Sequence, residues 1–156
     1  MKICLLTVGK TDIAWVREGL ETYASRLARY VPFSVREIPE PKNTSSLSRE
    51  QVKEKEGDLI LRNVSSSDTV ILLDEHGKEY RSVEFARMVG DLAMSGRNTV
   101  FMVGGAYGFS EAVYQRCDGK LSLSKMTFPH QMVRTIFAEQ LYRAFTIIKG
   151  EPYHHE

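Results

Sequence analysis

The run Thr69-Val70-Ile71-Leu72-Leu73-Asp74 decides the fold class of this chain, because it predicts a strand buried at the centre of a sheet. A helix is expected next, with Ser82 as its N-cap and an apolar stripe of Phe85, Met88, Val89 and Leu92. Another apolar run, from Asn98 to Val103, predicts a second strand and ends at two glycines. A strand, a helix and a strand in this order are typical of a parallel sheet.

The same alternation continues toward the amino end of the chain. Residues 3–8 and 33–38 each predict a strand, and Asp12 is the expected N-cap of the helix between them. That helix ends before Pro32 and carries an apolar stripe of Ile13, Val16, Leu20, Tyr23, Leu27 and Tyr30. Ser48 and Gln51 form a predicted capping box for a further helix that runs through residue 60.

Toward the carboxyl end, Ser110 is the expected cap of a short helix and residues 121–123 predict a fifth strand. The last helix has a wide apolar stripe of Met132, Val133, Ile136, Phe137, Leu141, Phe145 and Ile148. The sequence therefore predicts an α/β fold, with a mostly parallel sheet that is covered by helices on both faces. At 156 residues the chain is expected to form a single domain, residues 1–156.

Composition excludes several functional classes. The chain has no apolar run near the ~20 residues that a membrane helix needs, and its apolar start is too short for a signal peptide. Cys4 and Cys117 are too few for a disulfide framework and show no metal-ligand spacing, so we expect a reduced cytoplasm and no metal site. A net charge of +1 argues against a strongly basic nucleic-acid binder, although it permits a locally basic face.

Two loops are candidates for binding a ligand. Residues 103–108, Val-Gly-Gly-Ala-Tyr-Gly, directly follow a buried strand, where glycines allow the backbone to approach a ligand. The alternative is a tight turn that needs a positive φ. Residues 121–130 place a strand, small polar side chains, an apolar wall and a Pro-His pair before the last helix. There His130 is a ligand-loop residue or a hydrogen-bonded helix-start residue, and Met126 and Phe128 belong to a ligand wall or to the core.

The last helix and the tail form a third candidate. Glu139 and Arg143 are four residues apart on one helical face, where they form either a surface ion pair or part of a polar cleft. The tail contains Tyr153, His154 and His155, an aromatic and histidine cluster that is unusual for an end expected to fray.

Three segments near the carboxyl end together resemble the RlmH family of ribosomal RNA methyltransferases of the SPOUT class. The segments are residues 123–134 (LSKMTFPHQMVR), residues 139–144 (EQLYRA) and residues 152–154 (PYH). Residues 7–10, residues 52–57 and the Gly-Gly-x-x-Gly of residues 104–108 agree with the same family, so the resemblance covers essentially the whole chain.

The resemblance implies a SPOUT fold with a deep trefoil knot at the carboxyl end. It implies a homodimer that uses S-adenosylmethionine to methylate N3 of a pseudouridine in the helix 69 loop of 23S rRNA, on assembled ribosomes. The cofactor residues that it implies are Leu73, Gly104, Leu123, Ser124, Lys125, Met126, Thr127 and Phe128. At the penultimate position, where relatives commonly have Arg or Lys, this chain has His155.

Four residues are candidates for catalysis at a site shared between two subunits, with the cofactor held by one and the tail supplied by the other. Tyr153 would stack on the target base, and Arg143, oriented by Glu139, would stabilise negative charge. His154 would accept the N3 proton, unless that proton passes to water. Two alternatives are a non-catalytic α/β nucleotide-binding module and a dimeric interaction module whose last helix serves only as a dimer face.

Overall fold

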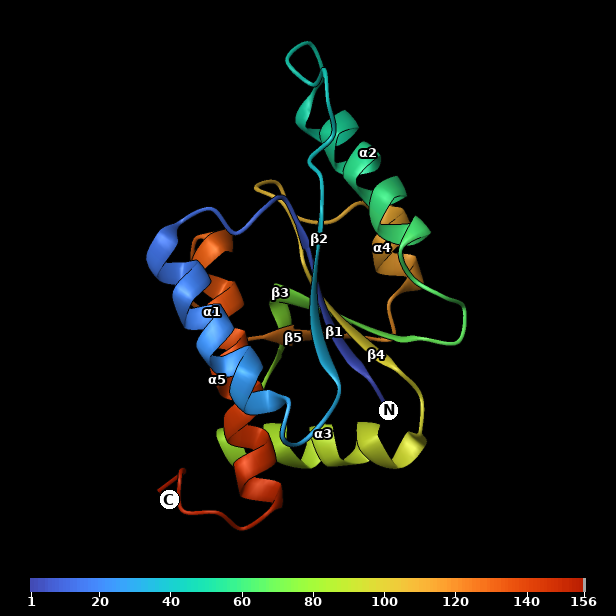
Figure 1. Ribbon diagram of the computed structural model, residues 1–156. Helices are drawn as coiled ribbons and strands as arrows, with labels where there is room; N and C mark the ends of the chain where they lie inside the picture. Colours follow the sequence, from blue (N-terminus) through green and yellow to red (C-terminus); the bar gives the residue numbers. More distant parts are fainter. Residues whose placement is uncertain (156) are drawn as a thin grey trace.

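The computed structural model describes residues 1–155 and contains one five-stranded sheet in the order β2-β1-β4-β3-β5 (Figure 1). All four strand pairs are parallel, which confirms the predicted sheet. The strands are β1 (Ile3–Val8), β2 (Phe33–Ile38), β3 (Thr69–Glu79), β4 (Thr99–Val103) and β5 (Gly119–Ser122). The helices are α1 (Ala14–Leu27), α2 (Arg49–Arg62), α3 (Ser82–Ser95), α4 (Glu111–Arg116) and α5 (His130–Ile148).

Helices cover both faces of the sheet, as the sequence predicts. Helices α1, α3 and α5 pack on one face, and α2 and α4 lie together on the other (Figure 1). Successive residues of a strand point to opposite faces, so Phe101 packs beneath α5 while the next residue, Met102, faces α2 and α4. The rings of Phe101 and Phe137 lie 4.7 Å apart between centroids and join β4 to α5. The trefoil knot stays a prediction.

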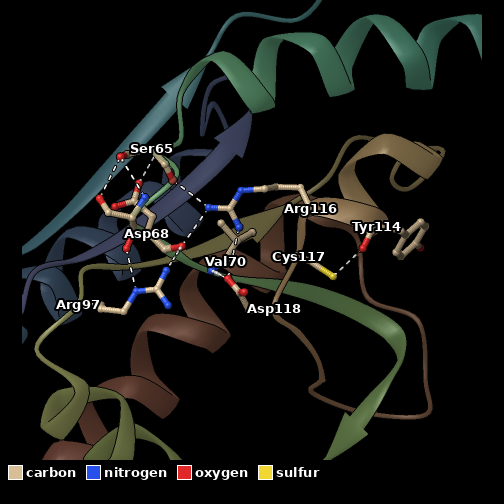
Figure 2. A network of polar contacts seen from close by, with 9 residues as sticks. Ser65, Asp68, Val70, Arg97, Tyr114, Arg116, Cys117 and Asp118 are labelled. Carbon is tan, nitrogen blue, oxygen red and sulfur yellow. Dashed lines mark hydrogen bonds and ion pairs between the residues drawn. The ribbon is translucent and has the colours of Figure 1, made fainter.

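A polar network fixes the sheet at the amino end of β3 (Figure 2). Arg116 donates to the backbone oxygens of Ser65 and Asp68 at 2.8 and 2.9 Å, and Arg97 donates to that of Ser67 at 2.9 Å. Asp118 and Val70 exchange two hydrogen bonds of 2.8 Å, which bring the start of β5 beside β3. Side chains thus hold the amino ends of β3 and β5 together.

Two predicted helix caps are wrong and two are confirmed. Helix α1 has Ile13 as its N-cap and no side-chain cap bond, while the backbone N–H of Asp12 donates to Gln131 on α5. Ser82 is the first residue of α3, and the Glu84 carboxylate accepts from the backbone N–H before it. The Ser48–Gln51 capping box and the Ser110 cap are present as predicted. Tertiary contacts between α1 and α5 hold the start of α1 without a cap.

Strand β3 extends past Asp74, where the sequence predicts its end, and reaches Glu79. Its pairing with β5 shifts between Leu73 and Lys78, so residues 74–77 arch out of the ladder. A Cβ at Gly77 would lie 2.7 Å from backbone atoms of residues 120 and 121. The bulge therefore needs glycine at this position, because the neighbouring backbone cannot give way. The fifth strand also begins earlier than predicted, at Gly119.

We predict that Gly77→Ala lowers the free energy of unfolding by about 1–3 kcal/mol, because the added methyl group overlaps the β5 backbone. Gly90→Ala is the matched control: nothing lies within 4 Å of its Cβ, and it sits inside α3, where alanine stabilises a helix by about 0.5–1 kcal/mol. Urea denaturation measures both. Equal stability of the Gly77→Ala variant and the wild type would contradict the close approach.

Candidate functional site

A cavity of about 540 Å³ opens at the bulge of β3 and at the carboxyl ends of β4 and β5. This volume lies within the ~300–1,000 Å³ range of small-molecule sites, and the carboxyl edge of a parallel sheet is where such sites gather. Its walls come from the β3 bulge, the glycine loop after β4, the loop between β5 and α5, and the start of α5. Both ligand loops that the sequence singles out therefore meet at one cavity.

Seven of the eight predicted cofactor residues line this cavity: Leu73, Gly104, Leu123, Ser124, Met126, Thr127 and Phe128. The eighth, Lys125, is absent from the lining, because its side chain is 88% exposed and its Nζ lies 3.9 Å from Glu79 Oε1. The glycine loop also contains the tight turn that the sequence analysis gives as the alternative to a ligand loop. Gly108 has φ +86°, and its N–H donates to the backbone oxygen of Gly105. What the seven residues bind stays a prediction at this point.

The sequence analysis does not name Asp74, Glu75 or Tyr114 as site residues, although all three line the cavity. The hydroxyl of Tyr114, on α4, donates to the Asp74 carboxylate in the β3 bulge. Burial raises the pKa of Tyr114, and the Asp74 carboxylate raises it further, so the phenol keeps its proton at neutral pH. Thr127 donates to the Glu75 carboxylate at 3.0 Å and so joins the loop before α5 to the β3 bulge. The position of Asp74 at the end of a predicted strand could have identified it as a cavity residue, whereas no sequence pattern linked Tyr114 to the cavity.

The carboxyl end of β1 is fixed by a guanidinium that has no exposed surface. Arg134, on α5, donates to the backbone oxygens of Val8 and Gly9 at 3.0 Å each and to the Thr11 hydroxyl at 2.7 Å. Its Nη1 lies 3.5 Å from the Glu37 carboxylate on β2. One side chain thereby joins α5 to β1 and β2 beside the residues of α5 that line the cavity, His130 and Val133.

The four predicted catalytic residues come together at the other end of α5. Arg143 donates to Glu139 Oε1 at 2.6 and 3.1 Å, and Tyr153 donates to the same oxygen at 3.0 Å. The Arg143 guanidinium lies over the Tyr153 ring, 4.7 Å from its centroid, and reaches His154 Nδ1 at 3.2 Å. Burial raises the pKa of Tyr153, and hydrogen bonds with Tyr23 and Glu139 add to that effect, so its hydroxyl stays protonated.

The tail is anchored rather than frayed. The backbone N–H of Glu151 donates to Thr146 at 2.9 Å, and the Tyr30 hydroxyl donates to the Glu151 carboxylate at 2.6 Å. That hydrogen bond is the main reason why the pKa of Tyr30 rises to about 12. The tail folds back along α5, and Tyr153 packs edge-on against Tyr142 at 4.8 Å. Glu156 lies outside the described residues.

None of these four residues lines the cavity of its own chain. The cavity touches α5 at His130 and Val133, whereas Arg143 lies thirteen residues after His130, or about 20 Å along the helix axis. A single copy of the chain therefore holds two separate constellations, one at each end of the same helix.

Comparison with known proteins places the chain in a family. A family model described as "Predicted SPOUT methyltransferase" matches residues 1–154. Curated proteins named "Ribosomal RNA large subunit methyltransferase H" match over their full lengths: the one from Parabacteroides distasonis is 51% identical over 100% of both chains, and the one from Bacteroides thetaiotaomicron is 52% identical over 100% of both. The chain belongs to the ribosomal RNA large subunit methyltransferase H family of SPOUT methyltransferases.

Membership of this family confirms the resemblance that the sequence shows and the fold class that it implies. A relative from Cytophaga hutchinsonii is 53% identical over 99% of this chain and 100% of its own. The chain is also similar in structure to the SpoU methyltransferase AviRb from Streptomyces viridochromogenes, a complex with AdoMet, with a TM-score of 0.49 and 13% identity over 96% of this chain and 59% of that one.

Within residues 1–155, no three His, Cys, Asp or Glu side chains are grouped so that they can hold a metal ion. In the same part of the chain, no helix has the length and apolar character that crossing a membrane requires.

We predict that Arg134→Met lowers the free energy of unfolding by about 3–5 kcal/mol, because it leaves buried backbone oxygens and the Glu37 carboxylate without their cation. The control is Arg17→Met on the exposed side of α1, with an expected change below about 0.5 kcal/mol. Guanidinium denaturation followed by circular dichroism measures both. A loss at Arg134 no larger than at Arg17 would contradict this role.

Proposed function

We propose that this protein transfers the methyl group of S-adenosylmethionine to N3 of a pseudouridine in the helix 69 loop of 23S rRNA, on the assembled ribosome. Relatives at about half identity over their full length are named as methyltransferases of large-subunit ribosomal RNA. The observation that carries the proposal is the single cavity at the carboxyl edge of the sheet, which seven of the residues implied by the family line together. Its setting would be the cytoplasm, where ribosomes are.

The cavity suits the proposed methyl donor in shape and in chemistry. Leu73, Val103 and Phe128 provide apolar walls for a flat heterocycle, and Gly104 presents backbone without a side chain. The carboxylates of Asp74 and Glu75 provide a negative wall, which suits a ligand that carries a sulfonium and an ammonium group. When bound, S-adenosylmethionine supplies an electrophilic methyl group.

The residues of this chain would prepare the nucleophile. The N3–H of a pseudouridine must lose its proton for the nitrogen to attack, and negative charge then develops on the neighbouring oxygens. Arg143 is suited to stabilise that charge, since Glu139 holds its guanidinium from one side through two hydrogen bonds. The Nδ1 lone pair of His154 faces Arg143, so His154 would accept a proton there only after Arg143 turns away.

The two ends of α5 would meet through a second copy of the chain. Met132, Ile136, Gln140 and Arg143 follow one another along one face of α5 and are all only partly buried in the single chain. In a two-fold dimer each copy presents the same surface, so a helix that packs antiparallel on this face brings its tail end to the cavity end of its partner. We therefore propose a homodimer with two composite sites.

We predict that Gly104→Val lowers the affinity for S-adenosylmethionine by roughly tenfold or more, because its Cβ would lie 3.1 Å from the ring of Phe109, another residue of the cavity lining, and the wall of the cavity would have to shift. Lys125→Ala is the matched control: the side chain lies outside the cavity lining, so we expect unchanged affinity. Calorimetry with S-adenosylmethionine measures both. Unchanged affinity in a folded Gly104→Val variant would show that S-adenosylmethionine does not bind in this cavity.

We predict that removing residues 153–156 abolishes methylation of ribosomes, because Tyr153 and His154 are lost with the tail. Cofactor affinity should stay within about twofold of the wild type, because the tail contacts α5 far from the cavity of its own chain. His155→Arg should keep or raise activity, since it restores the usual positive charge. Methyl incorporation into whole ribosomes and calorimetry on the same samples measure these outcomes.

Mixing two inactive variants tests the composite site directly. In a mixed dimer of the truncated chain and Gly104→Val, the truncated copy keeps its cavity and the other copy supplies an intact tail. Equal amounts that exchange freely give half mixed dimers with one complete site each, so roughly a quarter of wild-type activity should return. The composite site would be contradicted if methylation activity does not recover after subunit exchange, or if the truncated chain alone has normal activity. Methylation by neither wild type nor mixture would instead favour a binding or interaction module.

A further inference from the structure

Glu56 is a buried carboxylic acid that neither constellation uses. It lies on α2, on the opposite face of the sheet from α5, and only 6% of its surface is exposed. Its Oε1 has no hydrogen-bond partner among residues 1–155. Burial of a carboxyl group without a partner is costly, and the cost is far greater when the group is ionised. The position of Glu56 therefore calls for an explanation beyond packing.

Glu56 lies directly against the glycine loop of the cavity. A Cβ at Gly105 would sit 2.3 Å from Glu56 Oε2 and 2.7 Å from Oε1, so the carboxyl group occupies the space that a side chain at Gly105 would take. Gly105 lines the cavity and Glu56 does not, which places the carboxyl group outside the cavity and in contact with its wall. The neighbouring residue, Gly104, is the one proposed to meet the cofactor.

The surroundings of Glu56 favour its neutral form. Burial is the main reason why the pKa of Glu56 rises to about 7, and the charge of Glu40, on the loop after β2, raises it further. Glu40 itself lies against Gly9 at the end of β1. At pH 6 the carboxyl group is mostly neutral and can stay against the loop, whereas at pH 8 it is mostly ionised and is driven toward water.

We propose that Glu56 is a positioning residue of this methyltransferase, which in its neutral form supports Gly105 from outside the cavity and so keeps Gly104 in the conformation that binds the cofactor. The inference rests on the proposed function, because it concerns the affinity of the same cavity for S-adenosylmethionine. It adds a residue from α2, on the far face of the sheet, to a site built by loops from β3, β4 and β5.

The test is the pH dependence of S-adenosylmethionine affinity, measured by calorimetry from pH 6 to pH 8.5 on wild type and Glu56→Gln. If only the neutral form supports the loop, the wild-type affinity falls roughly tenfold between pH 6 and pH 8. Glu56→Gln keeps the shape of the neutral acid and cannot ionise, so its affinity should match that of the wild type at pH 6 and should lack this fall. The other ionisable side chains of the cavity, Asp74, Glu75, His76 and His130, are the same in both proteins, so a difference between the two profiles comes from Glu56.

Glu54→Gln is the matched control, because Glu54 is on the same helix and exposed, and it should show the wild-type profile. Thermal melts check folding. Since folding raises the pKa of Glu56 from 4.5 to about 7, wild-type stability should fall across that range and Glu56→Gln should lose this part of the fall. If Glu56→Gln does not fold, Glu56→Leu, which also stays neutral, takes its place.

Three results would overturn the inference: the same pH profile in wild type and Glu56→Gln, a wild-type affinity that does not change with pH, or weak binding by folded Glu56→Gln at every pH. The last would mean that the ionised carboxylate is the form that supports the loop. Failure of the proposed function looks different, because the wild type would then bind no S-adenosylmethionine at any pH.

Discussion

The hydrogen bonds of one buried guanidinium hold together the parts on which this structure depends. Arg134 reaches from the last helix to the end of the first strand and binds two backbone oxygens and a hydroxyl there. Because backbone oxygens at a strand end have no partner in the sheet, they need a donor, and this donor comes from the helix that also walls the cavity. The carboxyl edge of the sheet and the start of α5 are thus placed relative to each other by chemistry inside the core.

Close backbone contacts shape the rest of that edge. The β3 bulge approaches β5 at Gly77, and the glycine loop approaches the Glu56 carboxyl group at Gly105. In both places a side chain would collide with its neighbour, and at Gly105 this gives the cavity a wall of backbone beside the walls made by side chains. A backbone wall suits a ligand that is recognised by shape and by N–H and carbonyl groups.

The carboxyl end of α5 carries a cluster of polar and aromatic side chains instead of a cavity. Arg143 is surrounded by Glu139, Tyr153 and His154, so one cation gathers an anion, an aromatic ring and an imidazole. The cluster is preorganised, but it is about 20 Å along the helix from the cavity of its own chain. The two-fold dimer that we propose would let the cluster of one copy meet the cavity of the other.

The sequence by itself determined the elements whose signals are local. Apolar runs such as residues 69–74, the Ser48–Gln51 capping box and the Ser110 cap depend on neighbours within a few residues, and all are present. The motifs of residues 104–108 and 123–128 also identified the cavity loops, because they follow strands whose ends must share one edge. Helical spacing and the composition of the tail singled out Glu139, Arg143, Tyr153 and His154, and the reaction implied by the family resemblance supplied the catalytic roles expected of them.

Only the tertiary structure decided what depends on distant neighbours. The N-cap of α1 is not Asp12, because contacts with α5 replace the side-chain cap. Strand β3 continues past Asp74, because a bulge lets it resume pairing with β5. The Lys125 side chain lies outside the cavity lining, while Tyr114 and Glu56 reach the cavity or its wall from helices that the sequence analysis did not connect with it. These outcomes follow from packing between segments far apart in the chain, which no local pattern of residues encodes.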